Sequence, residues 1–362
     1  LTKEKKVFLI VEKSKTTKLL NKKKLKQKQI IDPRYILDFF EKLKKGNILL
    51  DEKTCSLHLE KVIKRKFKTI KGEDPIYILK SIKNNIEIKN MINAHIIDGV
   101  ALTKFIYWIK NLKKFNITEV EAQNKLEKFR KMNSKYLFPS FNTIAGSGKN
   151  GAIVHYRATK NNAKTLRRNE IFLCDSGGQY KFGTTDVTRT ICFGNQNQNI
   201  KNIFTNVLKG HIAVAQTDLN KKKTGKLIDK DARKFLKKDR LDYNHGTGHG
   251  VGFFLNVHEG PQAISKSNSV KIQKGMILSN EPGYYKKDKF GIRIENLVYV
   301  KKIGRKLGFE NLTLAPIEKE LINFNLLTKQ EKNYLFNYHL KVYSKISPFL
   351  NRNEKKWLAS FI

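Results

Sequence analysis

The longest periodic run of apolar residues lies between positions 81 and 112. Apolar side chains recur there at spacings of three and four, which is the repeat of one face of an α-helix. The pattern predicts one long amphipathic helix that packs on a core, with a break at Gly99. A second helix is predicted from Thr118, whose side chain caps it because Glu121 follows three residues later.

From residue 138 onward the pattern changes to short apolar segments separated by glycines. The predicted strands are rich in β-branched and aromatic residues and lie at 170–180, 184–194, 275–285 and 290–300. Between them, residues 200–217 and 229–238 have a helical period. Strands and helices alternate without a regular βαβ order, so the pattern predicts the α+β class.

The two ends of the chain differ from this middle part. Residues 1–79 combine short apolar runs with Lys-rich helical pieces, which indicates part of a small α/β unit. Residues 318–362 are mainly helical by pattern, and Pro348 ends the long helix there. The predicted division is therefore a partial N-terminal domain (1–79), a catalytic domain (80–317) and a helical extension (318–362).

Charge is the most unusual feature of the composition. The 362 residues include 73 Lys and Arg against 32 Asp and Glu, a net charge of +41. Such an excess suggests nucleic acid, but it is spread over the whole chain and only 12 of the basic residues are Arg. We interpret it as a compositional bias that disfavours a nucleic-acid partner, with the run Lys22, Lys23, Lys24, Lys26 and Lys28 as one local basic patch.

Cysteine usage and hydropathy indicate the compartment. Cys55, Cys174 and Cys192 form no CxxC pair, so neither a disulfide framework nor a zinc ribbon is indicated. No segment approaches the roughly 18 apolar residues of a membrane span. We expect a cytoplasmic location without a membrane partner. The chain begins with Leu rather than Met, and we expect a fragment or a processed product.

The scarce acidic residues are informative because several stand in apolar strands, where an unpaired carboxylate is costly to bury. Asp175 ends the run IFLC, and Asp186 follows a turn that brings two strands side by side. Glu281 and Glu295 stand on either side of a second predicted hairpin. Asp beside Gly and Thr is also common in ordinary turns, so the first pair alone leaves both interpretations open.

Histidines accompany these carboxylates. His245, His249 and His258 lie within fourteen positions, and the glycines in HGTGHGVG argue against the helix that a zinc-protease HExxH motif requires. Gly250, directly after His249, indicates a backbone that approaches another segment closely. A lone histidine is usually a core residue, but three so close together are harder to explain that way.

Together these groups indicate a hard, oxygen-rich metal site. Four carboxylates neutralise two divalent cations, and oxygen ligands with one imidazole suit Mn²⁺. Two such ions share a water, lower its pKa and present hydroxide to a carbonyl group. Arg293 stands two residues before Glu295, and period two predicts that it orients this carboxylate.

The flanks of these residues resemble a known family. The segments DSGGQYKFGTTDVTRT, GTGHGVGFFLNVHEGP, NEPGYY and GIRIEN are similar to the ligand motifs of the pita-bread metallopeptidases, most closely of aminopeptidase P, the Xaa-Pro aminopeptidases. The similarity runs from about Lys80 to the C-terminus. It implies a pita-bread catalytic domain and a metal-dependent exopeptidase that removes the residue before a penultimate proline.

The resemblance also implies roles for individual residues. Asp175 holds one metal ion, His249 and Glu281 hold the other, and Asp186 and Glu295 bridge both. The histidines that line the site, His155, His245 and His258, stabilise the tetrahedral intermediate, shuttle protons and shape the proline pocket. The expected cofactor is two Mn²⁺ ions, with Co²⁺, Zn²⁺ and Fe²⁺ as alternatives, and the nucleophile is a water or hydroxide between them.

The chain departs from long family members, which have two domains before the catalytic one. At most about 79 residues precede it here, so we expect the first domain to be missing. Because that domain contributes to assembly in relatives, a homodimer is expected only for the full-length protein. Three alternatives stay open: a prolidase, a methionine aminopeptidase, or a non-catalytic pita-bread module that binds RNA or protein.

Overall fold

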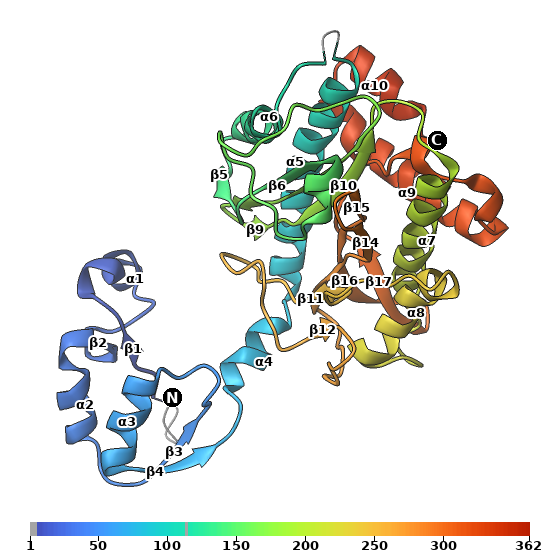
Figure 1. The fold of residues 1–362 in the computed structure, drawn as a ribbon. Coiled ribbons are helices and arrows are strands. Elements are labelled where there is room, and N and C mark those ends of the chain that lie inside the picture. The colour runs from blue at the N-terminus through green and yellow to red at the C-terminus, as the bar shows by residue number, and fades with distance from the viewer. Residues whose placement is uncertain (1–5, 113–114) are drawn as a thin grey trace. The chain divides into compact units, whose positions relative to one another are not determined.

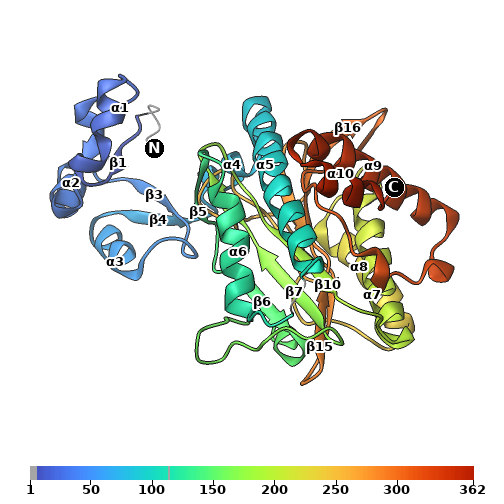
Figure 2. The same cartoon turned by 90° about the horizontal axis from the view of Figure 1, so that it is seen from above.

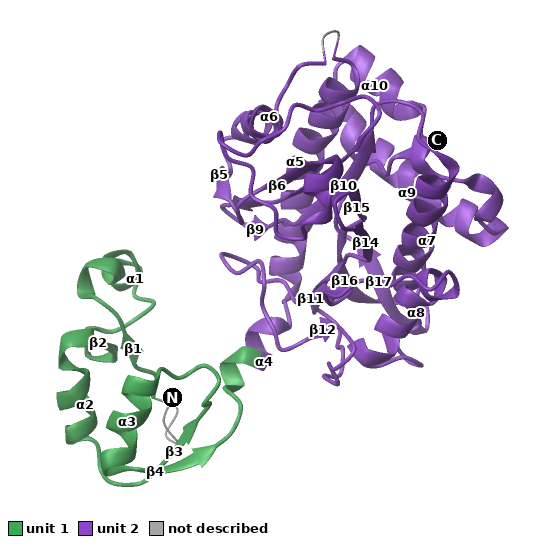
Figure 3. Cartoon of the chain, in the orientation of Figure 1, with its two compact units in different colours: residues 1–77 green, residues 78–362 purple. Residues whose placement is uncertain are grey.

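The computed structural model describes residues 6–112 and 115–362. The chain divides into two compact units, unit 1 (Leu1–Tyr77) and unit 2 (Ile78–Ile362), which Figure 3 shows in different colours. The boundary lies two residues before the one expected after residue 79, and each unit is described by itself.

Unit 1 is a small α/β unit. Two pairs of parallel strands, β1 with β2 and β3 with β4, are accompanied by short helices around a core of Leu50, Ile63 and Phe67. The Lys22–Lys28 run lies between α1 and β2 with its lysines exposed. The elements are β1 Leu9–Ile10, α1 Thr17–Asn21, β2 Ile30–Ile31, α2 Ile36–Lys42, β3 Asn47–Leu50, α3 Leu57–Lys66 and β4 Lys68–Lys71, and α4 (Pro75–Ser81) crosses the boundary.

The helices of unit 2 follow the apolar periodicity. They are α5 Asn85–Lys110, α6 Glu119–Lys131, α7 Gln198–Ala215, α8 Gly225–Lys238, α9 Lys329–Ile346 and α10 Arg352–Ala359. The Thr118 cap is confirmed, because Thr118 Oγ1 accepts from the Glu121 amide at 3.2 Å and the Glu121 carboxylate accepts from the Thr118 amide at 2.7 Å. In the described residues, no helix is both long and apolar enough to span a bilayer.

The predicted break at Gly99 is wrong, since α5 continues through it. The glycine serves packing instead: a Cβ at this position would lie 2.4 Å from the Leu314 carbonyl oxygen. The helix therefore needs a residue without a side chain there because another segment crosses it closely.

The strands of unit 2 form small antiparallel groups. The order is β10-β7-β6, β13-β16-β17 and β5-β8-β9, with the hairpin β14-β15 and the pair β11-β12. Their bounds are β5 Tyr136–Pro139, β6 Ile144–Ser147, β7 Ile171–Ser176, β8 Gly178–Tyr180, β9 Gly183–Thr184, β10 Val187–Cys192, β11 Gly248–His249, β12 Ala263–Ile264, β13 Ile277–Asn280, β14 Gly283–Lys286, β15 Phe290–Arg293, β16 Asn296–Ile303 and β17 Lys306–Asn311.

Helices cover these strands from two sides (Figures 1 and 2). On one side α5 and α6 pack on β7 and β10 through a core that includes Phe105, Leu126 and Phe172. On the other side α7 packs with β15 and α9, and Phe204 and Val342 belong to that core. The strands that carry the acidic residues therefore lie between two apolar layers, which fix their backbones.

Candidate metal centre

One cavity of about 480 Å³ in unit 2 brings the predicted site residues together. It is lined by all four carboxylates, the histidines and the arginine singled out in the sequence: His155, Asp175, Asp186, His245, His249, His258, Glu281, Arg293 and Glu295. These residues span 141 positions of the chain, so the fold assembles the group rather than any local motif.

The first carboxylate pair stands on neighbouring strands, as predicted. In the antiparallel pair β7 and β10, Asp175 lies opposite Thr188, and Asp186 immediately precedes β10. Both carboxylates are almost fully buried, with 8% exposure for Asp175 and 4% for Asp186. Two acids so deep in a core require positive charge nearby.

The second pair is supplied by the predicted hairpin. Glu281 follows β13 and Glu295 precedes β16, while β14 and β15 pair between them with Gly283 opposite Arg293. The Glu295 amide donates to the Thr188 carbonyl at 3.1 Å, which holds this segment against β10. The two pairs of acids thereby face one space.

His249, on β11, points its outer nitrogen at these acids. Its Nδ1 donates to the Gly250 carbonyl at 2.9 Å, which orients the ring and leaves Nε2 facing the acids. Nε2 lies 3.4 Å from Asp186 Oδ2 and 3.4 Å from Glu281 Oε1. A metal ion would bind Nε2 in place of its proton, while the Nδ1 hydrogen bond keeps the ring oriented.

The carboxylates of Asp175, Glu281 and Glu295 each accept a hydrogen bond on one oxygen, and this bond orients them. Arg293 Nη2 donates to Asp175 Oδ2 at 2.6 Å, and the Thr188 hydroxyl donates to Glu295 Oε2 at 2.7 Å. Asp175 Oδ1 and Glu295 Oε1 are buried without a hydrogen-bond partner among the described residues. The Ser279 hydroxyl similarly donates to Glu281 Oε1 at 2.9 Å.

Burial and mutual repulsion shift the pKa values of these acids. Burial and the neighbouring acids raise the pKa of Glu295 well above its ordinary value, and burial raises the pKa of Glu281 to about 7. Burial and the charge of Asp175 raise the pKa of Asp186. Burial lowers the pKa of His249, but Asp186 and Glu281 outweigh it and bring the value to about 9.

These features fit divalent cations. Asp186, His249 and Glu295 offer ligand atoms that all lie within 4.8 Å of one another. Asp175 adds a fourth side chain, and its Oδ1, like Glu295 Oε1, is buried without a partner among the described residues. Oxygen-rich donors with one imidazole suit hard or borderline divalent metals.

The other histidines are arranged around this group. The rings of His258 and His249 are 4.1 Å apart between centroids, and His245 Nε2 lies 2.9 Å from the Tyr285 hydroxyl. Burial lowers the pKa of both His245 and His258 to about 4, so both are neutral at pH 7. His155 lines the same cavity from the segment after β6.

The expected partner of Arg293 is corrected. Its guanidinium hydrogen-bonds Asp175, the Tyr285 hydroxyl and the Thr188 hydroxyl rather than the Glu295 carboxylate. Strand β15 ends at Arg293 and β16 begins at Asn296, so the period of two does not extend to Glu295.

Three further residues that hold the site were not singled out from the sequence. Ser279 stands two positions before Glu281, to which it donates, and this spacing indicates a same-face neighbour. Thr188 donates to Glu295, which is 107 positions away, so no local spacing indicates that contact. Tyr285 bridges His245 and Arg293, and nothing in the local pattern distinguishes it from the adjacent Tyr284.

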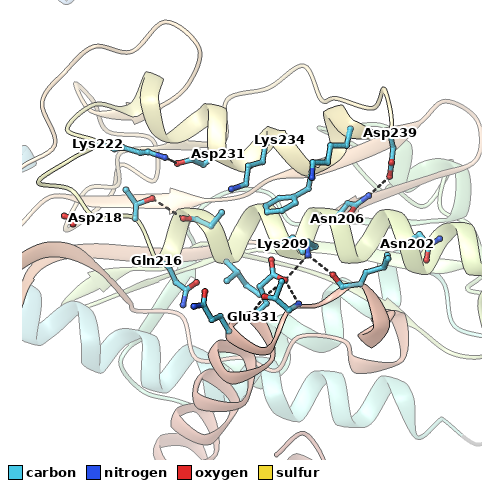
Figure 4. A pocket seen from close by; sticks show the side chains of 18 of the residues that line it. Asn202, Asn206, Lys209, Gln216, Asp218, Lys222, Asp231, Lys234, Asp239 and Glu331 are labelled. Atoms are coloured by element: carbon cyan, nitrogen blue, oxygen red, sulfur yellow. Dashed lines mark hydrogen bonds and ion pairs between the residues drawn. The ribbon is translucent and has the colours of Figure 1, made fainter.

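A larger cavity, of about 900 Å³, lies between α7, α8 and the start of α9 with the segment before it (Figure 4). None of the predicted site residues lines it. Its charges largely neutralise one another, as in the ion pairs Lys209 with Glu331 and Lys222 with Asp231. Size alone therefore does not identify the functional site.

Comparison with known proteins agrees with this geometry. A family model described as metallopeptidase family M24 matches residues 89–302, and one described as the C-terminal region of peptidase M24 matches residues 305–360. A probable Xaa-Pro aminopeptidase P from Laccaria bicolor is 45% identical over 299 residues, which cover 78% of this chain and 47% of the relative.

Solved structures extend the similarity to the fold. The X-prolyl aminopeptidase of Caenorhabditis elegans, described as a cytosolic enzyme with a di-nuclear active site, matches with a TM-score of 0.85 at 32% identity, over 92% of this chain and 57% of that one. A recombinant prolidase from Thermococcus sibiricus matches with a TM-score of 0.68 at 28% identity, over 83% and 82%. The α+β, pita-bread fold predicted from the sequence is thus confirmed, and the chain spans about half the length of the curated relatives it matches.

Proposed function

The chain belongs to metallopeptidase family M24, and we propose that it removes the N-terminal residue from peptides with proline in second position. The observation that carries the proposal is the set of buried acids and one imidazole around a single cavity, with two carboxylate oxygens left without partners. The identity to Xaa-Pro aminopeptidases supports the proline preference.

The proposed ligands are Asp175 for one metal ion, His249 and Glu281 for the other, and Asp186 and Glu295 for both. The contacts to their other atoms support this assignment. Arg293 occupies Asp175 Oδ2 and leaves Oδ1, while Thr188 occupies Glu295 Oε2 and leaves Oε1. Because these donors fix each side chain, little conformational entropy remains to be lost when a cation binds.

Bound divalent metals supply a Lewis acid for the carbonyl group and a water of lowered pKa. The chain's own groups supply the rest. Neutral His258 lines the cavity beside the acids, as does His155, and both donate hydrogen bonds to the oxygen on which negative charge develops. Tyr285 holds His245 by its Nε2, so we assign His245 to positioning of the cavity wall.

We also propose the metal, the cellular location, the oligomeric state and the domain bounds. Mn²⁺ fits the oxygen-rich donors, and the cytosolic description of the C. elegans enzyme supports a cytoplasmic location. We propose a homodimer for the longer protein, a catalytic domain over 80–317 and a helical extension over 318–362, the latter supported by α9 and α10.

The experiment uses the purified chain loaded with Mn²⁺ and three substrates: an Xaa-Pro-Xaa tripeptide, an Xaa-Pro dipeptide and a Met-Ala peptide. Release of the first residue from the tripeptide alone, or fastest from it, is expected. Cleavage of only the dipeptide would identify a prolidase, and cleavage of only the Met-Ala peptide a methionine aminopeptidase.

A variant pair separates chemistry from folding. Glu295→Gln removes a proposed bridging ligand and is expected to abolish hydrolysis. Glu52→Gln makes the same chemical change at a surface ion pair of unit 1, where exposed pairs contribute little, and is expected to leave the rate unchanged. Equal activity of both variants contradicts the proposal. RNA binding that survives Asp186→Asn in a protein without peptidase activity would instead favour a binding module.

A further inference from the structure

Arg157 is a cation at the mouth of the metal cavity that the proposed mechanism does not use. It lines the cavity and is exposed. Its guanidinium makes no hydrogen bond or ion pair with any residue in the described part of the chain, whereas Arg293, the other arginine of the lining, is buried and paired with Asp175. Arg157 is therefore the cation of this lining that is open to a ligand.

The backbone at Arg157 is held in place although its side chain is free. The preceding residue, Tyr156, is buried, and its hydroxyl donates to Glu119 at 2.9 Å. Asn162 Nδ2 donates to the Arg157 carbonyl at 3.0 Å, and Asn162 Oδ1 accepts from the Thr159 amide at 2.7 Å. His155, Tyr156 and Arg157 all line the cavity, so this anchored segment forms part of its wall.

The charge of the lining favours an anionic ligand group at this position. Four carboxylates balance two divalent cations, so no lining carboxylate is left over for Arg157. A guanidinium binds a carboxylate through two parallel hydrogen bonds. In an extended peptide, the carboxylate of the third residue lies about 7 Å beyond the bond that follows the first residue, and a cavity of about 480 Å³ accommodates a ligand of tripeptide size.

We propose that Arg157 binds the free α-carboxylate of the residue after proline, so that the chain prefers tripeptides over longer or amidated peptides. This inference rests on the proposed function and names its substrate class. Arg157 is a substrate-binding residue here and takes no part in the chemical step, so its loss acts mainly on KM.

The experiment measures kcat/KM of the Mn²⁺-loaded chain for three peptides: Ala-Pro-Ala, its C-terminal amide, and Ala-Pro-Asp amide. The third peptide tests whether a side-chain carboxylate substitutes for the α-carboxylate. We expect the free acid to be cleaved about five- to tenfold more efficiently than the amide, as for one charge-assisted contact at a partly solvated site. The ratio should fall as salt is raised, because the contact is exposed.

Variants make the assignment specific. Arg157→Gln is expected to bring kcat/KM for the free acid and for the amide within about twofold of each other. Arg157→Lys is expected to keep part of the preference for the acid, since lysine attracts a carboxylate without the bidentate hydrogen bonds. Arg167→Gln removes the same charge from an exposed position outside the lining and should change nothing.

The outcomes are distinct. If the acid and the amide are cleaved equally well, or if Arg167→Gln alters the ratio as much as Arg157→Gln, the inference is wrong while the peptidase function stands. A preference for Ala-Pro-Asp amide over the free acid also overturns the assignment to the α-carboxylate. If none of the three peptides is cleaved, the proposed function fails and this inference fails with it.

Discussion

Gly250 connects the candidate ligand His249 to the segment that carries His258, and it tolerates no side chain. A Cβ built there would lie 2.0 Å from the Glu259 carbonyl oxygen and 2.5 Å from Gln262 Nε2. The close approach expected from the sequence at this glycine is therefore confirmed. We predict that Gly250→Ala damages both stability and the metal site.

The magnitude follows from the contacts. Real Cβ atoms essentially never approach below 3.0 Å, so the backbones must separate by at least 1.0 Å, the difference between 3.0 and 2.0. The Glu259 amide donates to the Gly250 carbonyl at 2.8 Å, and this bond is strained or lost. Overpacking plus one hydrogen bond costs about 2–4 kcal/mol of the free energy of unfolding.

The displacement also reaches the imidazoles. His249 and His258 are each one residue from the clash, and their rings are 4.1 Å apart. Metal–ligand distances tolerate about 0.2 Å, and a misplacement of about 1 Å costs about 100-fold in rate. We therefore expect at least this loss in kcat/KM, together with weaker metal binding.

Urea unfolding and peptide hydrolysis measure the two effects, with Gly308→Ala as the control in the same unit. A Cβ at Gly308 would first meet the terminal methyl group of Ile303 at 3.2 Å, and this half-exposed side chain can turn away. Its cost should stay below about 1 kcal/mol. Wild-type stability and activity in Gly250→Ala, or equal losses in both variants, would show that no such clash occurs at Gly250.

Two other predictions concern stability. Burial raises the pKa of Asp98, but Arg130 Nε at 2.8 Å outweighs it, and the net shift is downward. The stability that this ion pair contributes is therefore present above the unfolded pKa of about 3.9, and it is lost as pH falls through the lower folded pKa. Asp98→Asn should lower the free energy of unfolding in urea by about 3–5 kcal/mol at pH 7 and by progressively less below pH 4. A difference between the two proteins that does not change with pH contradicts this prediction. Leu255 is exposed and has φ +69°, a region that favours glycine. Leu255→Gly should therefore be about 1 kcal/mol more stable than Leu255→Ala in thermal unfolding, and the opposite order contradicts backbone strain at this residue.

The elements whose apolar face is continuous could be predicted from the sequence. The helices over 85–110, 119–131 and 198–215 follow from their periodicity, and the hairpin between Glu281 and Glu295 follows from the turn between two apolar strands. The acids of the candidate centre could also be predicted, because a carboxylate inside an apolar strand is costly to bury without a partner.

What could not be predicted depends on contacts between distant segments. Gly99 resembles a helix break in sequence, yet it lies under Leu314, which is 215 positions away. Arg293 was assigned to its neighbour Glu295, but it hydrogen-bonds Asp175 from a different strand. The Tyr285 bridge and the free guanidinium of Arg157 likewise exist only once the cavity is formed.

The central claim is a two-metal centre that hydrolyses Xaa-Pro peptides, and one titration tests it most directly. Chelator-treated protein is titrated with Mn²⁺ while bound metal and cleavage of an Xaa-Pro-Xaa tripeptide are measured on the same samples. We predict that activity rises with bound metal and reaches its plateau at two ions per chain, and that Glu295→Gln binds less metal and stays inactive. Full activity in the metal-free protein, or an activity plateau at one bound ion per chain, would contradict a two-metal centre.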